Sequence, residues 1–104
     1  MTVKFEMVVT TLNDKKTNLK DSLEEVVEKN KEALIKGEMY GYKLAVKEIE
    51  ENKEEPAVVI SALEKKIAAL KEGLKTVKEE YDVHFINGTI QGFELAVNEM
   101  KQID

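Results

Sequence analysis

Apolar residues in the second half of the chain recur at alternating intervals of three and four positions. This 3.5-residue rhythm keeps one apolar seam on the side of a helix that faces a neighbouring helix. Lysines and glutamates take the outward positions, and Pro56 precedes the run, at a place where a helix tolerates its missing N–H. The pattern predicts a helix that opens at Pro56. Its seam consists of Ile60, Leu63, Ile67, Leu70, Leu74, Val77 and Tyr81.

The same frame occurs 51 residues earlier, with two polar substitutions. That seam consists of Val9, Leu12, Lys16, Leu19, Leu23, Val26 and Asn30. Lys16 and Asn30 replace Ile67 and Tyr81. Because a buried, unpaired ammonium is costly, Lys16 is expected at an exposed edge of the fold, with its head group in water.

The two frames belong to a tandem duplication. Residues 5–53 laid over 56–104 without a gap give 15 identities in 49 pairs. The strongest match pairs GEMYGYKLAVKEI, from Gly37 to Ile49, with GTIQGFELAVNEM, from Gly88 to Met100. Self-similarity of this kind fixes the unit of architecture, so we expect one domain, residues 1–104, made of two equivalent repeats.

The apolar frame changes phase after Val26 and Val77, which predicts a second helix in each repeat. The new frames are Ile35, Met39, Tyr42, Val46, Ile49 and Ile86, Ile90, Phe93, Val97, Met100. We place short connections near residues 29–33 and 81–85, where strong helix formers are few. Neither place has a Pro or Gly stop signal, so one long continuous helix per repeat is the alternative.

The ends of the repeats are less regular. The first helix is expected from about residue 6, with residues 1–5 as a frayed arm; the alternation of Val3, Phe5 and Met7 makes a short strand the alternative. The charged stretch from Lys47 to Glu55 reads as the solvated end of a helix and a linker.

A strip of small residues runs beside the apolar frame on the second helix of each repeat. It consists of Gly37, Gly41, Ala45 and Gly88, Gly92, Ala96, all spaced by four. Glycine inside a helix costs about 0.5–1 kcal/mol relative to alanine. Close approach of another helix backbone would compensate, as in small-xxx-small packing. A groove for a partner or ligand would use the same bare strip.

Composition narrows the functional classes. Sixteen Lys, no Arg and 21 acidic residues give a net charge of -5, which argues against general nucleic-acid binding. The chain contains no Cys, and no window resembles a signal peptide or a membrane span, so we expect a cytoplasmic protein.

Catalytic, metal and nucleotide signatures are missing from the sequence. His84 is the only histidine, flanked by Val83 and Phe85, and is expected to be half-buried with one nitrogen satisfied. Position 81, three before His84, is Tyr rather than the Glu of a di-metal Glu-x-x-His motif. The glycines are followed by no Gly-Lys-Ser/Thr phosphate loop. We therefore expect no enzyme activity, no cofactor and no metal.

One motif carries a resemblance. Gly-x-x-x-Gly-aromatic-x-x-Ala-x-x-Glu-hydrophobe occurs from Gly37 to Ile49 and from Gly88 to Met100. It resembles a motif common in small helical accessory proteins of bacteriophages and prophages of low-GC Gram-positive bacteria. The resemblance implies a binder or inhibitor of host factors, or an assembly aid, without catalytic residues.

The sequence thus predicts an all-α fold, a four-helix antiparallel bundle of two duplicated hairpins, with a homodimer favoured by the small core. The expected function is a non-enzymatic protein-interaction module, and the resemblance implies a phage-type inhibitor or adaptor that binds a host protein. Its expected contact residues are Tyr40, Tyr42, Phe93, Gly37, Gly41, Gly88 and Gly92. Exposed aromatic residues often anchor interfaces, and Tyr40 stands out because its counterpart is Gln91.

Two other functions stay open. In a small-ligand or nucleotide sensor, the glycine strip would open a pocket near His84 and Tyr81. An acidic DNA mimic would array carboxylates without lysines between them, and the interspersed lysines argue against it.

Overall fold

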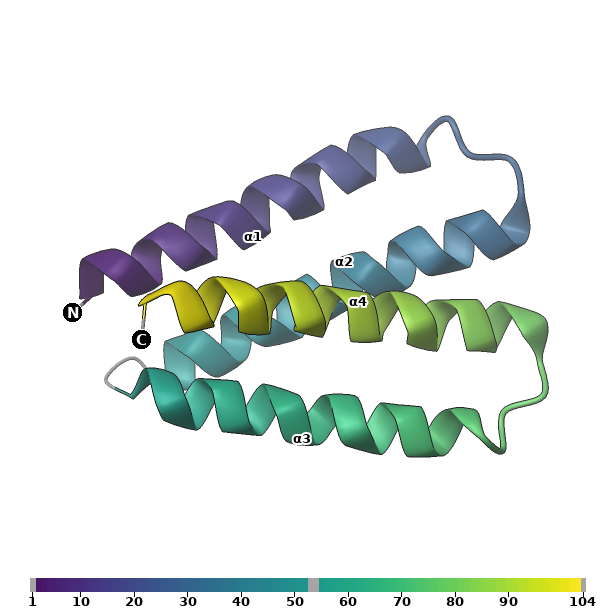
Figure 1. Cartoon of the computed structure of the whole chain (residues 1–104). Coiled ribbons are helices and arrows are strands. Elements are labelled where there is room, and N and C mark those ends of the chain that lie inside the picture. The colour runs from purple at the N-terminus through teal and green to yellow at the C-terminus, as the bar shows by residue number, and fades with distance from the viewer. Residues whose placement is uncertain (1, 53–54, 104) are drawn as a thin grey trace.

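The computed structural model describes residues 2–52 and 55–103, and these form four helices. Helices α1 (Thr2–Leu23) and α2 (Lys29–Glu51) make one antiparallel hairpin, and α3 (Pro56–Leu74) and α4 (Glu80–Ile103) make the second (Figure 1). The predicted all-α fold of two helical hairpins is confirmed. No helix within the described ranges combines the length and apolar character needed to cross a membrane.

The connections lie at residues 24–28 and 75–79, so their predicted positions at 29–33 and 81–85 are wrong, as is the continuous-helix alternative. The two connections have matching hydrogen bonds: Glu25 N–H to Ser22 C=O, Val26 to Leu23, Thr76 to Gly73 and Val77 to Leu74. The backbone turns at the point where the apolar frame changes phase. The start of α2 has no capping signal in its sequence, since Glu28 makes no side-chain cap hydrogen bond. Asn30 and Tyr81 consequently belong to α2 and α4 rather than to the first seams.

The first helix begins earlier than predicted. Helix α1 starts at Thr2, so both the frayed arm and the strand are wrong for residues 2–5, while Met1 lies outside the described residues. The physical reason is Phe5, which is buried in the core and holds the first turns in place. Pro56 occupies the first turn of α3 as expected. Helix α2 reaches Glu51 as a solvated helix end; the predicted linker residues Lys53 and Glu54 lie outside the described residues.

Helices α2 and α4 form the centre of the molecule. They run in the same direction and cross, while α1 and α3 lie on opposite sides of the pair (Figure 1). Each outer helix packs on its hairpin partner and also reaches the central helix of the other hairpin. Among the described residues, α1 and α3 make no close backbone approach to each other. The hairpins are therefore joined mainly through α2 and α4, with smaller contributions from α1 and α3.

The core lies where α1 and α3 begin and where α2 and α4 end. One cluster draws residues from all four helices, and its equivalent pairs are Val8/Val59, Leu12/Leu63, Tyr42/Phe93, Ala45/Ala96 and Ile49/Met100. Toward the connections, the seam residues of α1 and α3 are only half-buried. Lys16 is among them, in agreement with its expected place at an exposed edge.

Candidate interaction surface

The crossing of α2 and α4 depends on the four glycines that the sequence singled out. A Cβ atom at Gly37 would overlap the carbonyl oxygen of Phe85, and one at Gly88 would overlap that of Leu34. A Cβ at either Gly41 or Gly92 would lie 3.0 Å from the Cα atom of the other. Backbone thus meets backbone, which is the close approach that the spacing by four predicted.

The contacts at the crossing occur in pairs, and the 51-residue offset converts one member of each pair into the other. A Cβ at Gly41 would lie 2.6 Å from the carbonyl oxygen of Thr89, and one at Gly92 would lie 2.7 Å from that of Glu38. Thr89 is the repeat counterpart of Glu38, as Phe85 is of Leu34. The central pair therefore has an approximate twofold relation, with Gly41 and Gly92 at its centre.

Tyr42 and Phe93 lie beside this crossing, inside the core. They are only 3% and 1% exposed. The Tyr42 hydroxyl donates a hydrogen bond to the Glu38 carboxylate. Burial, and then the hydrogen bond and charge of Glu38, raise the pKa of Tyr42 far above its ordinary value. In the other repeat, Phe93 and Thr89 occupy the positions of Tyr42 and Glu38. The Thr89 hydroxyl donates instead to the carbonyl oxygen of Phe85, at 3.0 Å.

Tyr40 has a different environment. Its side chain is 42% exposed, and its ring lies 5.7 Å from that of Phe85, at an interplanar angle of 41°. This contact spans α2 and α4 on the surface of the crossing. The twofold-related positions hold Gln91 and Leu34, so the corresponding place on the other side has no aromatic ring.

Tyr81 and Lys36 extend the same region. Tyr81 is 37% exposed. The Lys36 ammonium pairs with Glu32 at 2.6 Å; the hydrogen bond and charge of Glu32 raise the pKa of Lys36, and Tyr81 adds to this shift. Tyr81 precedes Phe85 by four residues in α4, so the two rings lie on the same side of that helix. We refer to Lys36, Tyr40, Tyr81 and Phe85 as the aromatic side.

The predicted contact residues consequently separate into two groups. Gly37, Gly41, Gly88 and Gly92 are covered by the opposing helix, and Tyr42 and Phe93 are in the core. Only Tyr40 of the seven lies on the surface, so the seven do not form one exposed contact surface. Tyr42 and Phe93 both fit the apolar frame, and this signal for burial was present in the sequence. Sequence reasoning missed Phe85 as the neighbour of Tyr40 because nothing local relates residues 45 positions apart.

His84 is half-buried, as expected, but within the described ranges no side-chain hydrogen bond involves its imidazole, so the predicted partner of one ring nitrogen is missing. His84 lines an open hollow formed by residues of α2, α3 and α4, among them Leu34, Leu74 and Ile90. Tyr81 does not line this hollow, and neither do the glycines. The glycine strip therefore does not open the ligand pocket that the sensor hypothesis requires.

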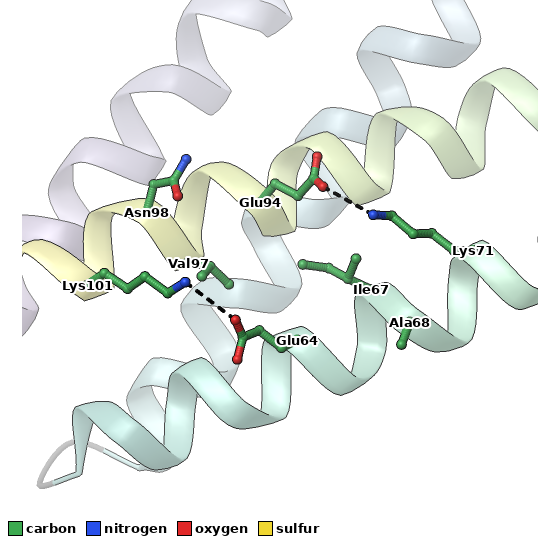
Figure 2. A pocket seen from close by; sticks show the side chains of 8 residues that line it. All are labelled: Glu64, Ile67, Ala68, Lys71, Glu94, Val97, Asn98 and Lys101. Carbon is green, nitrogen blue, oxygen red and sulfur yellow. Dashed lines mark ion pairs between the residues drawn. The ribbon is translucent and has the colours of Figure 1, made fainter.

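A second hollow of about 480 Å³ lies between α3 and α4 (Figure 2). Two ion pairs cross it, from Lys71 to Glu94 at 3.6 Å and from Lys101 to Glu64 at 3.5 Å. Each of the four side chains has about half of its surface exposed to solvent, so these pairs contribute little to stability. They neutralise this face locally.

Side chains that could bind a metal ion do not converge in the described part of the chain. Within residues 2–52 and 55–103, no three His, Cys, Asp or Glu residues are placed to hold a metal ion together. The exposed aromatic residues, Tyr40 and Tyr81, both belong to the aromatic side. Comparison of the chain with protein-family models, curated proteins and solved structures finds no match.

Proposed function

We propose that this chain is a non-enzymatic helical module that binds another protein, as a phage-type inhibitor or adaptor of a host factor would. One observation carries the proposal: Tyr40 is exposed on the crossing of α2 and α4, beside Phe85, where the fold does not require an aromatic residue. Amphipathic aromatic rings supply much of the contact energy in protein interfaces.

The duplication supports this interpretation. The glycines of the crossing and most residues of the core recur in both repeats as identical or similar residues. Tyr40 and Tyr81 are matched instead by Gln91 and Asn30, which occupy the equivalent places in the same architecture. The aromatic side is therefore an addition to the fold.

The half-buried seams of α1 and α3 are consistent with the homodimer expected from the sequence. Leu19, Leu23, Leu70 and Leu74 are all partly exposed where the outer helices approach the connections. A second chain that covers them would enlarge the small core. Sedimentation equilibrium measures the mass directly, and a monomer at micromolar concentrations would contradict this part of the proposal.

The test of the binding proposal is comparative affinity capture from a lysate of the native host, read by mass spectrometry. Three baits are compared: the parent chain, the variant Tyr40→Gln and the matched control Gln91→Tyr. Tyr40→Gln installs the residue found at the equivalent position of the second repeat. We expect a protein retained by the parent and by Gln91→Tyr but reduced at least fivefold with Tyr40→Gln. Equal retention by all three baits would contradict a role for the aromatic side.

The sensor alternative has weaker support because the glycine strip is covered. A thermal-shift screen with metabolites and nucleotides separates the two functions. A shift of several degrees with a small molecule, combined with capture that ignores Tyr40→Gln, would favour the sensor.

A further inference from the structure

The two hairpins differ most in the charge of their outward faces. In the second hairpin, the hollow between α3 and α4 is lined by Ile67, Lys71, Glu94 and Asn98 among others, and Lys71 pairs with Glu94 (Figure 2). This face has two lysines and two glutamates that neutralise each other.

The repeat carries those positions onto the first hairpin. The offset of 51 residues maps Ile67 to Lys16, Lys71 to Lys20, Glu94 to Lys43, and Asn98 to Lys47. The mapping is structural as well as sequential, because both hairpins share the same turn hydrogen bonds and the same core pairs. Where one hairpin has an ion pair, the other has two lysines. We call Lys16, Lys20, Lys43 and Lys47 the basic face.

The basic face is accessible and poorly neutralised. Lys20, Lys43 and Lys47 are exposed and Lys16 is half-buried. Among the described residues, none of the four makes an ion pair. Two further residues line the hollow of the second hairpin, Glu64 and Lys101. Their counterparts on the first hairpin are Asn13 and Glu50, so Glu50 is the acidic residue at these equivalent positions. Like charges at neighbouring positions disfavour the folded state slightly, so the arrangement contributes nothing to folding.

The basic face is continuous with the aromatic side. Lys36, Tyr40, Lys43 and Lys47 follow one another at helical spacing and are all exposed, so they form one outward stripe of α2. Lys36 and Lys47 are eleven positions apart, which corresponds to about 16 Å, or three turns, of helix.

From this juxtaposition we propose that the basic face binds an acidic polypeptide segment of the protein partner, about three helical turns long. The proposal deepens the proposed function and depends on it. Carboxylates of the segment pair with Lys20, Lys43 and Lys47, and an apolar side chain packs on Tyr40. Charge complementarity of this kind guides encounter and sets the register of a complex.

An acidic polypeptide fits this face better than a nucleic acid does. The chain has no Arg, the side chain best suited to form bidentate hydrogen bonds with phosphate. Glu32 neutralises Lys36 at one end of the stripe, and Glu50 lies at the other. The local positive charge is therefore small and short, whereas phosphate-backbone binding needs an extended one.

The test uses the full chain and three fluorescein-labelled probes in fluorescence anisotropy at low and high salt. The probes are a 20-residue peptide of glutamate and alanine, its lysine-and-alanine analogue, and a 12-residue oligothymidylate. The site variant is Lys43→Glu with Lys47→Asn, which installs the residues of the second hairpin. The matched control is Lys65→Glu with Lys66→Asn on α3, which changes the net charge by the same amount.

We expect salt-sensitive binding of the glutamate peptide, weakened about tenfold by the site variant and less than twofold by the control. Amide shifts in the NMR spectrum should map to the outward stripe of α2. The reciprocal change, Glu94→Lys with Asn98→Lys, should create a second site and raise the stoichiometry from one peptide to two. Circular dichroism melts verify that every variant is folded.

Several outcomes would overturn the proposal. Equal losses in the site variant and the control would mean that only net charge matters. Tighter binding of oligothymidylate than of the glutamate peptide would assign the face to nucleic acid. No binding of the glutamate peptide, combined with host capture that depends on Tyr40, would remove this inference and leave the protein-binding function standing; loss of that capture would remove the function itself.

Discussion

At the residue scale, the glycines of this chain have two distinct roles that their surroundings reveal. Gly41 and Gly92 meet backbone atoms of the opposing helix, so no larger residue fits without moving the helices apart. Gly73 lies in the last turns of α3 with nothing near the position of a Cβ atom, and no glycine among the described residues has a positive φ. Only the first kind is required by the fold.

Substitution of these glycines should therefore have opposite effects. We expect Gly41→Ala or Gly92→Ala to lower the free energy of unfolding by about 1–3 kcal/mol, and Gly41→Leu by more than about 2 kcal/mol, through overpacking. Gly73→Ala should raise it by about 0.5–1 kcal/mol, because alanine favours the helix. Urea denaturation measures all four, and parent-like stability of Gly41→Leu would show that the crossing does not need bare backbone.

A second prediction at this scale concerns Tyr42, whose pKa is raised by burial and by Glu38. An ordinary tyrosine loses its proton near pH 10. Above this pH the unfolded chain releases a proton that the folded chain keeps, so the contribution of Tyr42 is complete below about pH 10 and declines as the pH rises further.

Tyr42→Phe isolates this effect, and Phe93 shows that phenylalanine suits the equivalent position. At pH 7 we expect a loss of about 1 kcal/mol from the missing hydrogen bond. Between about pH 10 and 11 the free energy of unfolding of the parent should fall more steeply than that of the variant. Parallel curves from urea denaturation at each pH would indicate that Tyr42 ionises equally in both states.

At the element scale, the sequence predicted the helices well and their ends poorly. Periodicity identified all four helices and the glycine strip identified the crossing, because both signals repeat over several turns. The turns after Leu23 and Leu74 contain no Pro, the first hairpin has no Gly there, and Glu28 provides no side-chain cap for α2. Their positions come from tertiary packing of the seams, and Phe5 likewise extends α1 through a contact with the core rather than through local preference.

Because the two connections have the same hydrogen bonds, they should be interchangeable. Replacing residues 24–28, EEVVE, with the sequence of residues 75–79, KTVKE, changes Glu24, Glu25 and Val27. Val27 is 93% exposed, so its loss removes no core contact. We expect the free energy of unfolding to change by less than about 0.5 kcal/mol, with an unchanged circular dichroism spectrum; a loss above about 1 kcal/mol would mean that the turns are not equivalent.

At the scale of the whole molecule, the hairpins are joined as two subunits of a symmetric dimer would be. The backbone contacts that Gly37 and Gly41 make at the crossing have counterparts at Gly88 and Gly92 under the 51-residue offset. One hairpin alone would expose Phe5, Val8, Leu12 and Ile49, which lie in the shared core. A single repeat should therefore fold only by pairing with another copy.

We expect a peptide of residues 1–52 to form a helical homodimer in which Gly41 meets Gly41. Sedimentation equilibrium and circular dichroism, measured across a concentration series, should show helix content rising together with mass. Gly41→Leu in the same peptide should abolish both, whereas Val27→Lys should change neither. A peptide that stays monomeric at every concentration would contradict the equivalence of the halves.

Joining the two hairpins in one chain has a consequence for how the surface can vary. A true homodimer presents every outward substitution twice, so a cluster of positive charge on one subunit appears on the other as well. In the fused chain, one flank can become basic and aromatic while its mirror position stays neutral. The two flanks of the molecule thereby become different. A partner that prefers one flank can bind in a single orientation, with one partner per chain.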